Sequence, residues 1–310
     1  MAINRIMRVA LKALSYPDID MKKTYKIYRA IINMKNFHIR KYFYRTWDHV
    51  VSFENHNIPV RIFAPDAGGA QSILIFFHGG GWVTGNIDSY NEVCANMANM
   101  TGHIVVSVDY RLAPEYHFPA APEDCYRVVQ EIFLHTNLLK ISADRITIIG
   151  DSAGGNLAAA VSLMARDRGE FLPMRQILIY PATYFDHTEQ SPYASIRENG
   201  TDYLLTSKRI CDYMALYMAS DKDLKNPYFA PLASKNFSLQ PKTLIITAEY
   251  DPLRDEGEDY GMRLKSAGNE VEVHRIPDAL HGFFSLPSVF PQVRECYRII
   301  NDFLSEGSEQ

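Results

Sequence analysis

The segment GDSAGG at residues 150–155 places a serine among glycines directly after an apolar run. Glycines two positions before and after Ser152 leave room for a strand to turn sharply into a helix, with the serine at the apex. This is the G-x-S-x-G spacing of a nucleophile elbow, which lifts the serine hydroxyl towards a substrate. Tight packing or phosphate binding at a helix N-terminus would also favour glycines here. The elbow therefore requires a base, an acid and an oxyanion hole elsewhere in the chain.

A second glycine cluster follows the apolar run SILIFF at residues 72–77, in the sequence HGGGW. Three consecutive glycines cost backbone entropy on ordering, and a flexible surface loop would explain them without function. Their bare N–H groups can instead approach a developing oxyanion, with the N–H of Ala153 completing the hole. We therefore predict that this loop stabilises negative charge beside Ser152. Trp82, which follows the glycines, is expected near the substrate, although it could simply pack in the core.

Two further residues could complete a catalytic triad. Asp251 follows the run TLIITAE, and His281 follows the run EVEVHRI on a loop beside a glycine. Asp255 has a structural explanation instead, because negative charge is favourable in the first turn of the helix predicted there. A lone histidine is more often structural than catalytic. The chain order Ser152, Asp251, His281, with each residue at a predicted strand end, nevertheless favours a triad.

The elements that must position these residues alternate between short apolar runs and longer helical segments. Two strands are predicted around a turn at 55–57, and the later strands are predicted at 72–77, 103–110, 145–150, 176–180, 243–249 and 270–276. Helical segments are predicted near 3–14, 20–36, 88–100, 121–136, 153–168, 255–267 and 289–304. This alternation predicts an α/β fold with a mostly parallel sheet covered by helices. Residues 182–241 form an interval too long for a plain connection, so we expect it to carry its own structure.

Taken together, HGGGW, DYRLAPE (109–115), GDSAGG, DPLRDEG and HGF resemble the hormone-sensitive-lipase-like family of α/β-hydrolase esterases, from about residue 45 to the end of the chain. Asp151 matches the GDSAG branch. The resemblance implies an α/β-hydrolase fold with an eight-stranded sheet and a helical cap. It divides the chain into an N-terminal arm that is part of the cap (1–45), a first core part (46–181), a cap insertion (182–241) and a second core part (242–310).

The resemblance also implies roles for individual residues. The residues that match the family's triad and oxyanion-hole positions are Ser152, Asp251, His281, Gly80, Gly81 and Ala153. Sequence position, rather than the resemblance, indicates the substrate pocket: Trp82 directly follows the glycines, and Tyr203, Leu204 and Leu205 form an apolar cluster on an otherwise polar part of the insertion. Arg111 and Glu115 of DYRLAPE are expected to form ion pairs that brace their loop, and His78 is expected to be a loop brace.

We therefore predict a serine carboxylesterase that hydrolyses short-chain carboxylic esters through an acyl-enzyme, with no metal and no organic cofactor. An amidase, a deacetylase or an acyltransferase could use the same triad, and the sequence leaves these alternatives open. A non-catalytic ligand receptor on this fold would be expected to lose the triad histidine, whereas His281 is present.

Composition limits the remaining function classes. No apolar run approaches the roughly eighteen residues needed to cross a membrane, so no stable membrane anchor is expected. The four cysteines lie far apart with no C-x-x-C spacing, which favours a reducing cytoplasm.

Net charge is -4, but residues 1–45 contain eleven Lys and Arg against two Asp, a local charge of +9 that leaves -13 for the remainder. Such an arm could contact a membrane surface or nucleic acid, but a basic arm docked on an acidic body is the simpler interpretation. No nucleic-acid-binding motif accompanies the charge. Besides a small-molecule ester, a second copy in a homo-oligomer is a possible partner.

Overall fold

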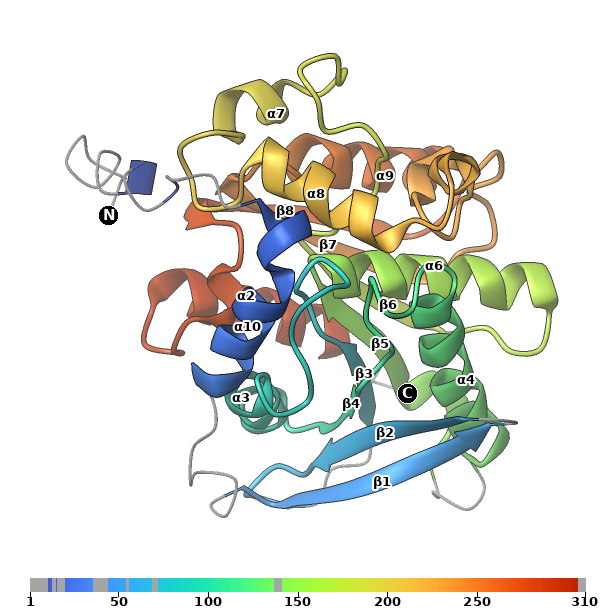
Figure 1. The fold of residues 1–310 in the computed structure, drawn as a ribbon. Helices are drawn as coiled ribbons and strands as arrows, with labels where there is room; N and C mark the ends of the chain where they lie inside the picture. The colour runs from blue at the N-terminus through green and yellow to red at the C-terminus, as the bar shows by residue number, and fades with distance from the viewer. Residues whose placement is uncertain are drawn as a thin grey trace.

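The computed structural model describes residues 11–12, 15, 20–35, 44–53, 56–68, 72–136 and 141–305. At its centre is an eight-stranded sheet in the order β1-β2-β4-β3-β5-β6-β7-β8 (Figure 1). The strands are β1 (Thr46–Phe53), β2 (His56–Phe63), β3 (Ile73–Phe77), β4 (Ile104–Val108), β5 (Ile146–Asp151), β6 (Arg175–Ile179), β7 (Lys242–Tyr250) and β8 (Val271–Leu280). β2 pairs antiparallel with β1 and β4, and the other neighbours are parallel. The predicted α/β class and mostly parallel sheet are confirmed.

The central strands are buried on both faces, which explains why they are continuous apolar runs rather than alternating ones. Ile73, Ile75 and Phe77 of β3 belong to one hydrophobic cluster, whereas Leu74 and Phe76 belong to the other. The first cluster includes residues of α4, α6 and α9, and the second includes residues of α3 and α10. The sheet therefore separates two helical layers, with α3 and α10 on one side and α4 and α6 on the other in Figure 1.

The main helices match the predicted segments to within a few residues. They are α2 (Met21–Lys35), α3 (Asn91–Thr101), α4 (Ala120–Leu134), α6 (Ala153–Arg168), α9 (Arg254–Ser266) and α10 (Pro291–Ser305). Glycines in the left-handed conformation follow α3 and α6 at Gly102 and Gly169, and their N–H groups close the last turns. The helix predicted at 3–14 falls mostly outside the described residues.

The long interval at 182–241 does contain structure of its own. It includes α7 (Ala194–Asn199), α8 (Ser207–Tyr217) and the 3-10 turns η3 (Asp221–Lys225) and η4 (Pro231–Ala233). α8 begins at an N-cap, because the side chain of Thr206 accepts a hydrogen bond from the N–H of Arg209. α2 packs beside α8 (Figure 1), and the Met21 N–H donates to Asp212 Oδ2 at 3.3 Å. Segments far apart in the sequence thus meet over the sheet.

The expected ion pairs of the DYRLAPE segment connect it to distant elements. Arg111 forms hydrogen bonds with both carboxylate oxygens of the buried Asp124 in α4. Glu115 pairs with Arg29 of α2 at 2.9 Å. Arg111 and Glu115 therefore connect α4 and α2 to the same loop.

All four cysteines are free thiols. Cys94, Cys125 and Cys296 are buried in α3, α4 and α10, whereas Cys211 in α8 is partly exposed. Burial raises the pKa of each thiol. Within the described ranges, no helix is both long and apolar enough to cross a membrane.

Candidate active site

Ser152 occupies the sharp turn between β5 and α6, as the glycine spacing predicts. Its backbone has φ 55 and ψ -118, a strained conformation for a residue with a side chain. Its N–H donates to the Ile179 carbonyl at 2.8 Å, which ties the turn to β6. A Cβ on Gly154 would collide with the Phe77 carbonyl oxygen, so α6 can approach β3 this closely only because residue 154 has no side chain. The turn therefore depends on the glycine.

His281 connects Ser152 to Asp251. Its Nε2 lies 2.9 Å from Ser152 Oγ, and its Nδ1 lies 2.7 Å from Asp251 Oδ2. Asp251 is fully buried, and its other carboxylate oxygen accepts a hydrogen bond from the Leu253 N–H at 2.9 Å. The three residues come from the ends of β5, β7 and β8. Parallel strands present these ends at one edge of the sheet, and ligands bind there in open α/β folds.

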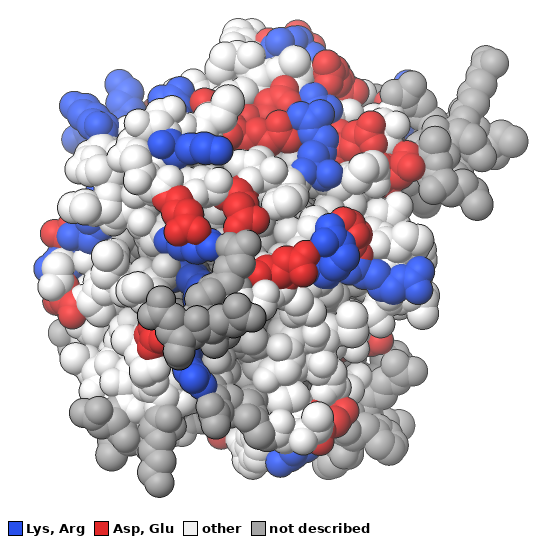
Figure 2. All heavy atoms as spheres, turned by 180° about the vertical axis from the view of Figure 1, so that it is seen from behind, with Lys and Arg blue, Asp and Glu red and all other residues white. Residues whose placement is uncertain are grey.

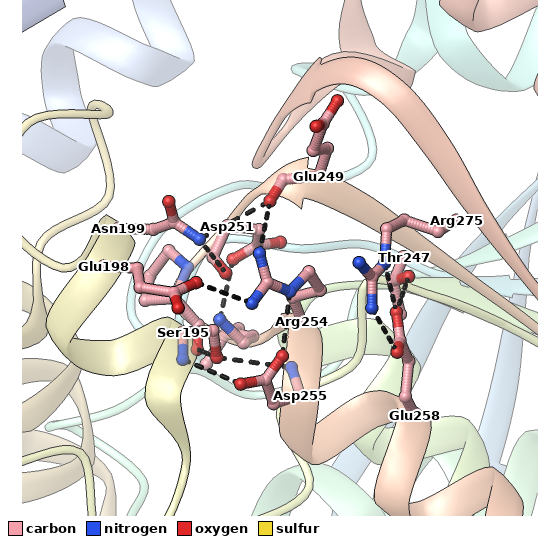
Figure 3. A network of polar contacts seen from close by, with 12 residues as sticks. Ser195, Glu198, Asn199, Thr247, Glu249, Asp251, Arg254, Asp255, Glu258 and Arg275 are labelled. Atoms are coloured by element: carbon pink, nitrogen blue, oxygen red, sulfur yellow. Dashed lines mark hydrogen bonds and ion pairs between the residues drawn. The ribbon is translucent and has the colours of Figure 1, made fainter.

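The loop that carries Asp251 is fastened to α7 (Figure 3). Asn199 Nδ2 donates to the Asp251 carbonyl at 3.3 Å, and Ser195 Oγ donates to the Pro252 carbonyl at 2.7 Å. The Ser195 N–H in turn donates to Asp255 Oδ2 at 2.8 Å. α7 therefore holds the backbone at Asp251 and at the residue that follows it.

Asp255 has the structural role expected of it. Arg254 Nε donates to Asp255 Oδ1 at 2.8 Å, while Arg254 Nη2 reaches Glu198 Oε2 at 2.8 Å (Figure 3). Burial alone would raise the pKa of Asp255, but the hydrogen bonds from Arg254 and Ser195 hold it below its ordinary value. Asp255 thus joins α9 to α7 and does not contact His281.

The glycine loop lies against Ser152. Gly80 and Gly81 have φ of 119 and 62, and both line the same pocket as Ser152 and Ala153. His78 supports the loop from behind: it is fully buried, its ring stacks on Tyr110 at 4.3 Å between centroids, and burial lowers its pKa to about 4. A neutral imidazole in this position is a brace, as expected.

Asp151 is a buried carboxyl beside the candidate triad, and it holds the glycine loop in place. Its Oδ1 accepts a hydrogen bond from the Gly79 N–H at 2.7 Å. Its Oδ2 accepts hydrogen bonds from the hydroxyls of Tyr90 and Tyr180, at 3.2 and 3.4 Å. Burial raises the pKa of Asp151 to about 6, although the Gly79 and tyrosine hydrogen bonds and the nearby His281 oppose that rise. The GDSAGG motif contains this residue but does not indicate its partners.

The hollow in front of Ser152, here called the serine pocket, has a volume of about 200 Å³. Trp82 lines it and also packs in the core: the side chain is 3% exposed and stacks on Tyr217 at 4.6 Å between centroids. Both interpretations of Trp82 thus apply. Leu205 lines the serine pocket as expected.

Tyr203 and Leu204 are not among the described residues that line the serine pocket. The Tyr203 ring is buried against Tyr250, with 5.1 Å between centroids. Leu204 has φ 69, and its N–H donates to Ser15 Oγ at 2.9 Å. The turn at Leu204 therefore directs only one residue of the cluster towards the pocket.

Several lining residues had no sequence signal. Tyr28 and Ile32 come from α2, Tyr213 comes from α8, and Tyr90 precedes α3. A Cβ on Gly81 would collide with the Tyr213 ring, so the glycine loop and α8 are in direct contact. These residues reach the pocket because of how α2 and α8 pack, which no local motif specifies.

A second hollow, here called the side cavity, adjoins the serine pocket and has a volume of about 240 Å³. Both hollows are lined by Ile32, Tyr90 and Ser285. The side cavity extends between α2 and the segment after η5 (Phe283–Ser285), where Leu286 and Pro287 line it. In the described part of the chain, no group of three or more His, Cys, Asp or Glu is placed to hold a metal ion.

Comparison with known proteins agrees with this geometry. Residues 74–285 match the family model described as the alpha/beta hydrolase fold. The chain is 36% identical over 249 residues to an arylesterase of Saccharolobus solfataricus, covering 80% of each chain. It is 38% identical over 243 residues to esterase LipI of Mycobacterium tuberculosis, covering 77% of this chain and 74% of that one.

A solved structure, a hyperthermophilic esterase from the archaeon Pyrobaculum calidifontis, superposes with a TM-score of 0.87 at 34% sequence identity, covering 99% of each chain. The matched region covers the eight-stranded sheet and the Ser152 turn. The chain therefore belongs to the hormone-sensitive-lipase-like family of α/β hydrolases.

Proposed function

We propose that the protein is a serine carboxylic ester hydrolase in which Ser152 is the nucleophile, His281 the general base and Asp251 the residue that orients it. One observation carries the assignment: a single imidazole lies within hydrogen-bond distance of both the strained serine and the buried carboxylate. Carboxylic ester hydrolysis fits the family, because esterase relatives match the chain over most of their length.

The acylation step follows from these contacts. His281 Nε2 accepts the Ser152 hydroxyl proton as Oγ attacks the ester carbonyl carbon. Asp251 keeps the proton on Nδ1 and stabilises the imidazolium that forms. The developing oxyanion is held by the backbone N–H groups of Gly80, Gly81 and Ala153, each worth roughly 3 to 4 kcal/mol in the transition state. His281 then protonates the leaving alcohol, and Ser152 carries the acyl group.

Deacylation repeats the sequence with water as the nucleophile. His281 takes a proton from the water, the hydroxide attacks the acyl carbon, and Ser152 leaves with the proton returned from His281. The same chemistry would allow an amine leaving group or an alcohol acceptor. The choice among ester, amide and transfer reactions is therefore decided by the pocket and not by the triad.

We further propose that the segments 1–45 and 182–241 form a cap that restricts the acyl group. Tyr28 from the first segment and Leu205 and Tyr213 from the second support this, because all three line the serine pocket. A volume of about 200 Å³ favours acyl chains of roughly two to six carbons, since each buried CH₂ contributes about 0.8 kcal/mol only while there is room for it. The free cysteines fit a reducing compartment such as the cytoplasm.

An acyl-length series on aryl esters, run beside the matching aryl amides, tests this function. We expect kcat/KM to rise over the first few carbons and then to fall, with much slower turnover of the amides. Added alcohol should not divert most of the acyl group from water. Faster amide cleavage would identify an amidase, and dominant transfer to alcohol would identify an acyltransferase. A kcat/KM that keeps rising through long chains would contradict the capped pocket.

A further inference from the structure

The outward face of α2 is both basic and apolar. α2 contains five Lys and Arg and no Asp or Glu. Lys22, Lys23 and Lys26 are exposed on it. Ile27 and Ile31 are also exposed, at 65% and 49%, although isoleucine is usually buried. These five residues are here called the α2 face.

The opposite side of α2 is anchored to the protein, so the α2 face has a fixed orientation beside the pocket. Arg29 donates to the carbonyls of Val83 at 2.7 Å and Ala113 at 2.6 Å. Tyr28 and Ile32 line the serine pocket. Residues three or four apart are neighbours on a helix surface, so Ile31 lies beside the pocket-lining Tyr28 as well as beside Ile27.

Apolar residues also lie on the side of the side cavity that faces away from α2. The side cavity is lined by Ile32 from α2 and by Leu286 from the segment after η5. Leu286 is 44% exposed, and Val289 and Phe290 near it in sequence are exposed as well. Exposed apolar side chains thus lie near both sides of a cavity that shares Ile32, Tyr90 and Ser285 with the serine pocket.

The α2 face is basic, although two carboxylates lie close to it. Glu115 pairs with Arg29 of α2 at 2.9 Å and also lies close enough to Lys26 for its positive charge to help lower the Glu115 pKa. Lys23 lies 3.5 Å from Asp20, which precedes the helix, and no acidic residue occurs within α2 itself. On the opposite face of the molecule, Lys and Arg lie side by side with Asp and Glu (Figure 2). A basic helix with exposed isoleucines therefore stands beside the entrance to a pocket for ester chemistry.

We propose that the α2 face docks on an anionic lipid surface, with Ile27 and Ile31 inserted among the acyl chains and the lysines contacting the headgroups. Helices with this pattern lie in the plane of membrane interfaces, and lysines near an anionic surface add to the binding. Docking would place the side cavity against the lipid, so esters dissolved in that layer could enter the serine pocket. This last step rests on the proposed function. A second copy of the chain fits the face less well, because two such faces would bring six lysines together.

Vesicle sedimentation with the full chain tests the docking directly. The protein should carry Ser152→Ala, so that binding is measured without turnover. We expect binding to vesicles that mix phosphatidylserine with phosphatidylcholine, weak binding to phosphatidylcholine alone, and release as salt rises, because screening weakens exposed charge interactions. Equal binding to both vesicle types, or none to either, would overturn the proposal.

Two sets of variants separate the contribution of the lysines to vesicle binding from the contribution of the isoleucines. Lys22→Gln, Lys23→Gln and Lys26→Gln together should weaken binding to the anionic vesicles by about a hundredfold. Ile27→Ser with Ile31→Ser should weaken it to a similar extent. The matched controls are Lys222→Gln with Lys225→Gln on η3, and Leu239→Ser, which removes an equally exposed apolar side chain. We expect the controls to bind like the parent protein, and unchanged binding by the α2 variants would refute the model.

The catalytic consequence is measured in the chain that retains Ser152. Hydrolysis of a water-soluble aryl acetate should be unaffected by the α2 variants, whereas hydrolysis of tributyrin carried in the anionic vesicles should fall. If vesicle binding holds but neither ester is cleaved, the proposed function fails and the docking survives. If both esters are cleaved equally by parent and variants, the docking role is wrong. A loss of dimers in the Ile27→Ser, Ile31→Ser variant without any change in vesicle binding would assign the face to a second copy instead.

Discussion

The ring of Tyr180 packs against the imidazole of His281, with 4.7 Å between the ring centroids. The Tyr180 hydroxyl reaches Asp151, which also holds the glycine loop through Gly79. One buried carboxyl is therefore connected both to the loop that faces Ser152 and to the aromatic ring that packs against His281. Its protonation state should influence the site even though it touches neither His281 nor the serine hydroxyl by hydrogen bond.

Asp151 should make stability fall as pH rises. Burial raises its pKa to about 6 in the folded protein, whereas the ordinary value is 3.8. Between these values the folded chain keeps a proton that the unfolded chain has lost, so the free energy of unfolding decreases with rising pH, by about 3 kcal/mol at most. Asp151→Asn cannot titrate. In urea titrations, the unfolding free energy of the wild type minus that of the variant should therefore decline from pH 4 to pH 6. An increase of this quantity with pH would contradict the assignment.

Ser152→Ala should abolish ester hydrolysis and leave the fold intact, because alanine removes only the nucleophilic oxygen. A fluorescent aryl phosphonate should label the wild-type chain at Ser152, as shown by mass spectrometry of the peptide, and should not label the variant. Circular dichroism provides the folding control. Labelling of another serine with retained activity would show that the nucleophile lies elsewhere.

Asp251 and Asp255 should behave differently when each is changed to asparagine. Asp251→Asn presents the wrong partner to His281 Nδ1, so kcat should fall by about a thousandfold or more with little change in KM. Asp255→Asn weakens the connections to Arg254 and Ser195, so its main effect should be a loss of stability of about 1 kcal/mol. Steady-state kinetics and thermal melts on both variants measure which one loses kcat and which one loses stability. A larger loss of kcat in Asp255→Asn than in Asp251→Asn would exclude Asp251 as the triad acid.

Gly154→Ala should be far more damaging than a glycine change in open space. The new Cβ would collide with the Phe77 carbonyl and force α6 away from β3, at a cost of about 3 kcal/mol or more. Gly102→Ala is the matched control: a Cβ there meets nothing within 4 Å, and the left-handed backbone costs about 1 kcal/mol. Comparable melting temperatures for the two variants would show that the elbow tolerates a side chain.

Leu205→Ala should enlarge the serine pocket and shift the preferred acyl length upwards. Each additional CH₂ that finds room should gain about 0.8 kcal/mol, or about fourfold in kcat/KM. Leu204→Ala, one residue earlier and outside the pocket lining, should leave the profile unchanged. The acyl series on aryl esters measures both. A shift in the Leu204→Ala profile alone would mean that the turn presents a different residue to the substrate.

Local signals in the sequence are sufficient to predict the strands, the elbow and the grouping of Ser152 and Asp251 around His281. Apolar runs specify buried strands, and strand ends in a parallel sheet meet at one edge, so Ser152, Asp251 and His281 could be placed together without knowing the packing. The pocket-lining residues of α2 and α8 are different, because their positions depend on how helices from distant parts of the chain dock. Tyr213 and Tyr28 therefore carried no signal, and an apolar cluster at 203–205 did not reveal that its first two residues turn away from the pocket.

Cys211 differs from the other three thiols because it is partly exposed, while Cys94, Cys125 and Cys296 are buried. It lies in α8 directly after Ile210, a residue that lines the serine pocket. Maleimide reagents should consequently modify this sulfur first in the folded wild-type protein, without removal of any native cysteine. A spin label attached there would report how far α8 moves from the sheet when a phosphonate occupies the pocket.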